Sequence, residues 1–463
     1  MNRWKDSIKK IIALELPLLG AILYTLLYAW LWFKVYYPNY VLLKLKFYIN
    51  GHILVMGIYV VLLLFFMTTY GGLKVGYLKP VDVILSQMFA LLAVNVITYF
   101  EDSLMRNWML PIWPMVRCTL QQILVSIVWV YFSDAVYKKA FPPSELILIH
   151  GERPIGDILH KFSTRPDKYK VIEMIDIADG IDAIKGRILE QKKPVVLWDI
   201  NVSDRNKLMK FCYENSIRIY LMPKIPDVLI AGSAQLHLFD TPLFMTREYA
   251  LTFNQRLIKR TIDVVCAALL LLITSPIFAV TALLVHFYDG GPVFYKQTRC
   301  TIGQKEFKII KFRSMRVDAE KDGVARLASQ NDDRITPIGA FIRKVRIDEL
   351  PQLINILSGD MSFIGPRPER PEIIAQYVEE MPEFVFRMKV KAGLAGYAQI
   401  YGKYNTTPYD KLKLDLTYIQ SYSVWLDLKL MLLTLKILLR PESTEGISEG
   451  QITALKNDVK QDE

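Results

Sequence analysis

The chain has 463 residues, 52% of them hydrophobic, and a net charge of 57 − 46 = +11. The length suits two or three domains, and the apolar content is typical of a membrane protein rather than of a soluble one. The positive charge suits an anionic membrane surface or phosphate-bearing substrates, and with no nucleic-acid-binding motif we expect no nucleic-acid partner. The four cysteines lack metal-ligand spacing, so we expect reduced thiols.

Four apolar segments open the chain, each long enough to cross a bilayer core: residues 11–33, 53–69, 83–100 and 108–132. If the N-terminus lies inside, the cytoplasmic flanks carry Arg3, Lys5, Lys9, Lys10, Lys74, Lys79, Lys138 and Lys139, and the outer flanks carry Lys34, Lys44, Lys46 and Arg106. This asymmetry predicts that both ends of the transmembrane region, residues 1–140, are cytoplasmic. Glu15 and Arg117 fall inside apolar runs, which makes them candidate partners within the bundle, although Glu15 could equally snorkel near a helix end.

A different pattern follows, with short apolar runs alternating with polar helical stretches. The runs at residues 146–149, 171–175, 195–198 and 217–221 predict strands of a parallel sheet in a small βαβ domain, residues 141–245. Gly151 and Gly156 follow the first strand without completing a Gly-x-Gly-x-x-Gly fingerprint, and Asp176 is a weak candidate for a ribose ligand. We favour a scaffold without a cofactor.

Another apolar run spans residues 264–285 and is interrupted by Ser275-Pro276. Its length alone would allow a fifth span. Basic residues flank both ends, which favours the same cytoplasmic side for both, and the Ser-Pro pair offers a place to turn back. We therefore predict a re-entrant membrane helix over residues 257–287.

The stretch with the clearest chemistry begins at Asp348 and Glu349. They precede an apolar series with helical spacing, residues 350–357, so they should lie at a helix N-terminus, where a carboxylate stays ionised and a phosphate is stabilised. An ionised Asp348 can attack phosphorus, and Glu349 can hold Mg²⁺ together with substrate phosphates. Arg367, in Gly-Pro-Arg-Pro, offers a guanidinium on a stiff turn. The alternative is that the two carboxylates only cap the helix, as acidic pairs at helix starts usually do.

Resemblance overturns the capping interpretation. Asp-Glu-Leu-Pro-Gln-Leu from Asp348, then Asn355, Gly-Asp-Met-Ser from Gly359 and Gly-Pro-Arg-Pro from Gly365 closely resemble the bacterial sugar transferase family, the polyprenyl-phosphate hexose-1-phosphate transferases. The resemblance is strong over residues 239–439. It implies the long form of the family: an α-helical bundle of four transmembrane helices, a Rossmann-like (CoA-binding-like) module, and an α-rich catalytic domain at residues 246–440 with the re-entrant helix, before a flexible tail at 441–463.

The resemblance also implies a reaction. Such enzymes transfer hexose-1-phosphate from a UDP-sugar to undecaprenyl phosphate and release UMP, which begins exopolysaccharide, capsule or O-antigen synthesis. Asp348 would be the nucleophile, forming a phospho-aspartate sugar intermediate, and Glu349 the Mg²⁺ ligand. The matching substrate-binding positions are Lys259, Arg260, Gln297, Arg299, Lys311, Arg313, Arg367 and Gln399. Three positions depart from the family pattern: Thr301, Ala392 and Ala395 stand where Gly, Pro and Thr are usual.

The resemblance implies a multi-pass protein of the bacterial inner membrane, with its catalytic domain on the cytoplasmic face, and we expect a homodimer. We expect the UDP-glucose or UDP-galactose type, although no residue identifies the sugar. One alternative is a nucleotide-sensing membrane scaffold with an inactive transferase domain, which would have no physical need to keep the Asp348–Glu349 pair. Another is a nucleotide-sugar epimerase or dehydratase, which would need the glycine fingerprint that the sequence lacks.

Overall fold

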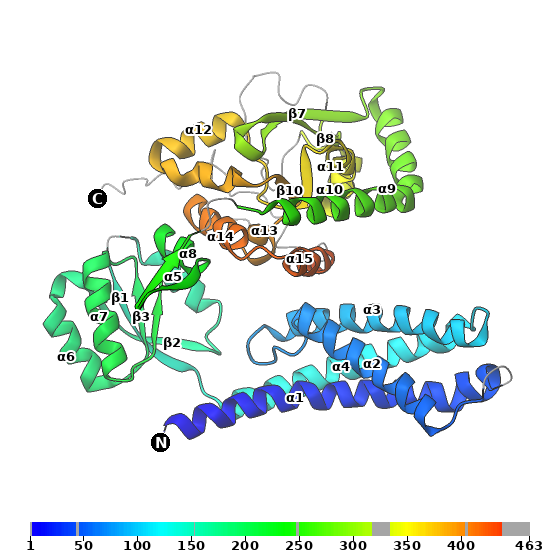
Figure 1. Cartoon of the computed structure of the whole chain (residues 1–463), viewed down its shortest axis with the longest axis horizontal. Helices are drawn as coiled ribbons and strands as arrows, with labels where there is room; N and C mark the ends of the chain where they lie inside the picture. The colour runs from blue at the N-terminus through cyan, green and yellow to red at the C-terminus, as the bar shows by residue number, and fades with distance from the viewer. Residues whose placement is uncertain are drawn as a thin grey trace. The chain divides into compact units, whose positions relative to one another are not determined.

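The computed structural model describes residues 2–42, 46–151, 153–246, 250–316, 334–402 and 406–437. The chain forms two compact units, Met1–Pro223 and Lys224–Glu463, which are described separately (Figure 1). The predicted tail at residues 441–463 and the predicted outer residue Lys44 lie outside the described residues.

The first unit begins with a bundle of long helices. They are α1 (Asn2–Leu31), continued by the π-helix η1 (Trp32–Val41), then α2 (Ile49–Tyr70), α3 (Pro80–Arg106) and α4 (Ile112–Ala140). Together with α9 of the second unit, they make five helices of the described part that are long and apolar enough to cross a membrane. The first three predicted apolar segments lie within α1 with η1, α2 and α3, and the fourth, residues 108–132, begins before α4 and ends inside it.

Polar side chains fill part of the bundle interior. Tyr28 hydroxyl lies 3.1 and 3.2 Å from the two carboxylate oxygens of Asp102, and Asn95 Nδ2 donates to Gln122 Oε1 over 2.7 Å. The prediction of Glu15 and Arg117 as partners inside the bundle is wrong, because both are exposed. A polar group without water must be paired within the protein, and here tyrosine hydroxyls, amides and the Asp102 carboxyl group pair with one another.

A parallel sheet completes the first unit, as the strand pattern predicts. Its strands are β1 (Ser144–His150), β2 (Tyr169–Asp176), β3 (Val195–Trp198) and β4 (Ile219–Leu221), in the order β2-β1-β3-β4. The helices α5 (Gly156–Ser163), α6 (Ile181–Gln191) and α7 (Val202–Glu214) connect them (Figure 1). A Cβ on Gly151 would lie 2.4 Å from the Asp199 carbonyl oxygen, so this glycine allows two loops to pack closely. Asp176 caps the 3₁₀ turn η2 (Ile177–Asp179) by accepting from Ala178 N–H.

The second unit is mainly helical with three pairs of short strands. It begins with α8 (Ile225–Ala231), the hairpin β5 (Ala234–Leu238) and β6 (Thr241–Met245), α9 (Phe253–Asp289), and the hairpin β7 (Phe294–Cys300) and β8 (Glu306–Phe312), joined by the 3₁₀ turn η3 (Ile302–Gln304). It continues with α10 (Pro337–Lys344), η4 (Ile347–Glu349), α11 (Gln352–Ser358), β9 (Met361–Ile364), α12 (Pro371–Glu380) and η5 (Pro382–Lys389). The last elements are β10 (Ala392–Ala395), α13 (Tyr397–Tyr401), α14 (Pro408–Gln420) and α15 (Val424–Ile437). β9 and β10 pair in parallel at the centre of its hydrophobic core.

Helix α9 includes the predicted break. The backbone stays helical through Pro276, but the helix changes direction, and its later part rises steeply from the first in Figure 1. Its first part is held by Asp263, whose Oδ1 accepts from the Ser362 hydroxyl and from the Phe363 N–H, each over 3.0 Å. Its later part packs Phe278 against Phe312, with ring centroids 4.8 Å apart. Both parts of α9 therefore contact the same compact unit.

Candidate active site

Asp348 and Glu349 lie on the 3₁₀ turn η4, just before α11. The predicted helix starts three residues later than the carboxylates suggest, at Gln352, with Pro351 as its N-cap. Proline has no N–H, so residue 351 cannot make the α-helical bond that would join the two helices. The turn begins at Arg346, whose left-handed φ of 56° is uncommon for a residue other than glycine. Both carboxylates are buried, with 8% of each residue exposed.

Glu349 is surrounded by positive charge. Its Oε1 accepts from Arg367 Nη2 over 2.9 Å and from Lys311 Nζ over 3.3 Å, and its Oε2 lies 3.5 Å from Arg346 Nη1. Burial raises the pKa of the Glu349 carboxyl, but the charges of Arg367, Lys311 and Arg346 outweigh it and hold the pKa well below its usual range. Glu349 is therefore ionised at neutral pH.

Asp348 has the opposite balance. Burial and the neighbouring negative charge of Glu349 raise the pKa of Asp348 to about 6, against the lowering effect of Lys311, Arg343 and Arg367. The helix N-terminus predicted from the sequence does not dominate, because desolvation disfavours the charged form more strongly. At neutral pH Asp348 is still mostly ionised. No cation among the described residues is hydrogen-bonded to it, so this carboxylate is available as a nucleophile.

The β7–β8 hairpin supplies three predicted site residues. Lys311 lies on β8. Gln297 and Arg299 lie two positions apart on β7, so their side chains share one face, and Arg299 Nη2 donates to Gln297 Oε1 over 2.7 Å. Burial lowers the pKa of Arg299 to about 10, with Glu369 opposing the shift. Asn355 fixes α11 to the edge of β8: its side chain accepts from Ile310 N–H and donates to the Lys308 carbonyl, each over 2.9 Å. This bridge holds Lys311 beside Glu349.

Arg367 is positioned by three glycines that lie against one another. A Cβ on Gly393 would come within 2.1 Å of Gly365 N, and a Cβ on Gly396 within 2.2 Å of Gly365 O. The glycines after Lys391 allow close approach of the backbone of the Gly-Pro-Arg-Pro turn. They allow that turn to lie directly on β10.

The remaining predicted substrate-binding residues make contacts within the protein. Lys259 Nζ donates to Asp427 Oδ2 over 2.6 Å and to the Ile364 carbonyl over 2.9 Å, and Arg260 donates to the last carbonyls of α11. Arg313 Nη2 lies 3.5 Å from the Val285 carbonyl at the end of α9. Gln399 lies on α13, and its buried Oε1 accepts no hydrogen bond from any described residue. These contacts within the protein do not test substrate binding, so the binding roles of Lys259, Arg260, Arg313 and Gln399 stay predictions.

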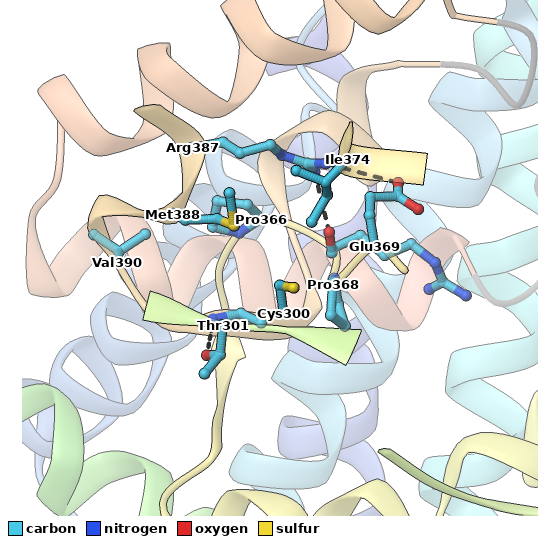
Figure 2. A pocket seen from close by; sticks show the side chains of 11 residues that line it. Cys300, Thr301, Pro366, Pro368, Glu369, Ile374, Arg387, Met388 and Val390 are labelled. Atoms are coloured by element: carbon cyan, nitrogen blue, oxygen red, sulfur yellow. Dashed lines mark hydrogen bonds and ion pairs between the residues drawn. The ribbon is translucent and has the colours of Figure 1, made fainter. Parts of the chain in front are cut away.

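Sequence reasoning missed Arg387, which lies behind Arg367. Arg387 and Asp415 are buried and form a charged cluster with the half-buried Glu369, in which Arg387 Nη2 lies 2.8 Å from Asp415 Oδ2. Arg387 and Glu369 line a cavity of about 10 Å³, about the size of one water molecule, together with apolar side chains such as Ile374 and Met388 (Figure 2). A single arginine in η5 has no periodic pattern that would mark it as buried. Arg346 was within the motif, but only its backbone conformation and its contact with Glu349 reveal its place.

The carboxylate pair can be tested as a magnesium site. No group of three His, Cys, Asp or Glu side chains with metal-ligand geometry occurs in the described part of the chain, but Mg²⁺ commonly uses only one or two carboxylates together with substrate phosphates. Glu349 Oε2 has one long contact, whereas Oε1 has two. The donor set therefore fits Mg²⁺, with Glu349 Oε2 as the available ligand atom.

Comparison with known proteins identifies a family and several curated relatives. The model of the bacterial sugar transferase family matches residues 254–441. Among curated relatives, the UDP-glucose:undecaprenyl-phosphate glucose-1-phosphate transferase of Escherichia coli is 38% identical over 49% of this chain and 50% of its own length. The UDP-N-acetylgalactosamine-undecaprenyl-phosphate N-acetylgalactosaminephosphotransferase of Aeromonas hydrophila is 40% identical over 39% of this chain and 44% of its own length.

The match thus spans about half the length of these two relatives. It spans more of a shorter one, the UDP-glucose:undecaprenyl-phosphate glucose-1-phosphate transferase of Caulobacter vibrioides, which is 38% identical over 40% of this chain and 71% of its own length. The matched region contains the carboxylate pair, the basic hairpin and the Gly-Pro-Arg-Pro turn. The chain belongs to the bacterial sugar transferase family.

Proposed function

We propose that this protein transfers a hexose-1-phosphate from a UDP-sugar to undecaprenyl phosphate, giving undecaprenyl-diphosphate-sugar and UMP, as the first membrane step of a surface polysaccharide. The observation that carries the proposal is the buried Asp348–Glu349 pair, with Lys311 and Arg367 bonded to Glu349 and Asp348 left as an ionised carboxylate. The names of the relatives support both substrates.

The first step uses Asp348. One carboxylate oxygen attacks the β-phosphorus of the UDP-sugar, a P–O bond to Asp348 forms, and the bond from that phosphorus to the bridging oxygen breaks, so that UMP leaves with the electron pair. Lys311, Arg367 and Arg299 supply positive charge around the site, which stabilises the charge that develops on the phosphate oxygens. Glu349 keeps Lys311 and Arg367 in place.

The second step releases Asp348. A phosphate oxygen of undecaprenyl phosphate attacks the same phosphorus, the bond to Asp348 breaks, and the aspartate leaves as a carboxylate ready for the next cycle. A covalent intermediate allows the two bulky substrates to bind in turn. Mg²⁺, when bound through Glu349, would neutralise diphosphate charge.

The contacts of α9 support a re-entrant helix, and the basic residues that flank it favour the cytoplasmic side for the catalytic domain. Arg260 bonds to α11, and Val285 packs with Phe312 of β8. In a straight helix Arg260 and Val285 would be about 38 Å apart, more than the thickness of a bilayer core of about 30 Å. Since α11 and β8 are themselves joined through Asn355, a spanning α9 would have to reach the same domain from both sides of the membrane. A bend at Pro276 avoids this conflict.

The proposal is tested with the full-length protein in lipid nanodiscs. A panel of UDP-sugars is offered with and without undecaprenyl phosphate, and UMP release and transfer of labelled sugar phosphate to lipid are measured. We expect both products for at least one sugar, which also identifies the sugar. Binding of a nucleotide without UMP release would instead support the nucleotide-sensing scaffold. The same particles, sized by mass photometry, test the predicted homodimer.

A further inference from the structure

All four backbone carbonyls of residues 366–369, the stretch that includes Arg367, accept hydrogen bonds. The carbonyls of residues 366–369 accept, in that order, from Gly393 N–H, Arg387 Nη2, Arg299 Nη1 and Cys300 N–H, over 2.9, 3.1, 3.3 and 3.0 Å. These donors come from separate segments of the domain. One of them, Arg387, holds the residue whose guanidinium meets Glu349.

Arg387 is itself fixed by α14. Its Nε donates to Asp415 Oδ2 over 2.9 Å, its Nη2 lies 2.8 Å from the same oxygen, and its Nη1 lies 3.7 Å from Glu369 Oε1. Figure 2 shows its guanidinium beside Glu369, at the cavity behind the turn. Arg387 is only 3% exposed, so it does not present its charge to a substrate.

A buried ion pair is not by itself an argument for stability, because desolvation of the two charges offsets much of their attraction. What Arg387 adds is geometric: the guanidinium is planar and presents its donors in fixed directions, toward Asp415 on one side and the Arg367 carbonyl on another. An ammonium on a flexible stem cannot make all these bonds at once. The pair therefore links α14 to the backbone of the active-site turn.

We propose that Arg387, fixed by Asp415, is a positioning residue that holds the backbone of Arg367 so that the Arg367 guanidinium meets Glu349 and the substrate diphosphate. The kinetic effect expected from this role rests on the proposed function. The contact from Arg387 to the Arg367 carbonyl is independent of that function.

The kinetic test compares Arg387→Lys with a control, Lys389→Gln. Lys389 is an exposed residue of the same element η5, and its ammonium lies 5.7 Å from the centroid of the Phe386 ring. We expect Arg387→Lys to lower kcat for UMP release by about tenfold to hundredfold with a smaller change in KM, because a displaced catalytic group loses transition-state binding. Lys389→Gln should stay within about twofold of the wild type. If Arg387→Lys does not fold, Asp415→Asn, which retains Arg387 and the shape of its partner, takes its place.

A double variant separates positioning from a general effect on the fold. If Arg387 acts through Arg367, then Arg387→Lys should cost nothing further once Arg367→Gln has removed the guanidinium, so the double variant should match Arg367→Gln in kcat/KM. Losses that multiply would mean that Arg387 acts independently of Arg367. That result, or wild-type kinetics of Arg387→Lys, would overturn the proposal.

Amide hydrogen exchange gives a readout that does not depend on turnover. In the full-length protein, residues 363–372 should exchange faster in Arg387→Lys than in the wild type and in Lys389→Gln, because one anchor of the turn is lost. If the wild type releases no UMP from any UDP-sugar, the proposed function fails while the exchange result still decides the positioning role. Unchanged exchange in this segment would reject the role even if the reaction is as proposed.

Discussion

Asp348 and Glu349 are adjacent in the chain, yet their surroundings move their pKa values in opposite directions. Burial and the charge of Glu349 raise the pKa of Asp348 to about 6. Burial also raises the pKa of Glu349, but Arg367, Lys311 and Arg346 lower it further than burial raises it. Two carboxyls whose environments separate their pKa values commonly have different roles. Here Glu349 is the anion that holds Arg367 and Lys311 in place, and Asp348 is the carboxylate that we propose as the nucleophile.

Replacing Asp348 by Asn tests the nucleophile. The amide keeps nearly the same shape but cannot attack phosphorus, so kcat for UMP release should fall by about 10³-fold or more. The exposed Glu380→Gln on α12 serves as a control and should leave kcat unchanged. Mass spectrometry of the wild type, stopped before lipid is added, should find a sugar phosphate on the peptide that contains Asp348. UMP release at the wild-type rate by Asp348→Asn would exclude the covalent role.

The pH dependence of kcat/KM reports the free enzyme. Asp348 must be ionised to attack, and its pKa is raised to about 6, so the reactive fraction decreases as pH falls through 6. We expect kcat/KM to fall about tenfold per pH unit well below pH 6 and to level off above pH 7. Glu349 contributes nothing to this limb, since its positive neighbours lower its pKa. An acid limb near pH 4, where an ordinary carboxyl titrates, would contradict the burial argument.

Glu349→Gln tests the magnesium site. A neutral amide is a weaker ligand for a hard cation, so the Mg²⁺ concentration for half-maximal rate should rise by about tenfold or more. If Glu349 only balances the charges of Lys311 and Arg367, kcat would fall while the Mg²⁺ titration kept its midpoint. The two roles are thus separable in a single titration series.

The sequence alone predicts some of these site residues and not others. Asp348, Glu349 and Arg367 stand in a contiguous motif, so their meeting was predictable from spacing and resemblance. Lys311 comes from a distant strand, and its predicted place in the site agrees with its contact with Glu349. Arg387 and Asp415 are 28 positions apart and meet only after η5 and α14 pack together, so no local pattern predicts their pair.

At the scale of elements, two departures from the family pattern explain each other. Thr301, where glycine is usual, accepts from Ala392 N–H over 3.1 Å, and it donates to the Asp360 carbonyl over 2.9 Å. Proline, usual at position 392, has no N–H to donate, and glycine has no hydroxyl to accept. The sequence analysis could identify each departure but not their contact, which lies across 91 positions of the chain. One hydrogen bond therefore joins the two residues that depart from the pattern.

A double-mutant cycle tests this coupling. Thr301→Gly leaves the buried Ala392 N–H unpaired, and Ala392→Pro leaves the Thr301 hydroxyl without a donor; each should cost about 1–2 kcal/mol of stability. The Thr301→Gly/Ala392→Pro double variant should be more stable than the sum of the single effects predicts, by about 1 kcal/mol. Thermal unfolding in one detergent measures all four proteins. Additive losses would show that the two departures are independent.

Predictability of the larger elements followed the strength of their periodicity. The parallel sheet was predictable because β1 and β3 are continuous apolar runs between polar stretches. The polar interior of the bundle was not, since Gln87 and Asn95 look like interruptions in apolar helices until their partners on other helices are known. The bend of α9 was predictable from Pro276, although its backbone remains helical there.

At the scale of the whole molecule, the sequence offers two membrane topologies for α9. Most of its apolar surface is exposed, including Leu272 and Ile273 at 72% and 69%, so this helix meets lipid in either case. If it spans, the Lys296 side and the Arg256 side lie on opposite faces, and the site is separated from cytoplasmic UDP-sugars. If it turns at Pro276, both sides and Asp348 lie together. The contacts of both ends of α9 with one compact unit favour the turn.

Cysteine accessibility in intact cells decides between them. Arg256 and Lys296 are suitable positions, because both are exposed, whereas Arg260 is engaged with the α11 carbonyls. In a background in which the native cysteines are replaced, we expect both introduced cysteines to be protected from an impermeant thiol reagent and to react after the cells are permeabilised. Lys46→Cys, between α1 and α2 on the predicted outer side, should react without permeabilisation and shows that the reagent works. Reaction at position 296 alone, from outside, would mean that α9 spans the bilayer and that its two ends cannot share the domain that carries Asp348.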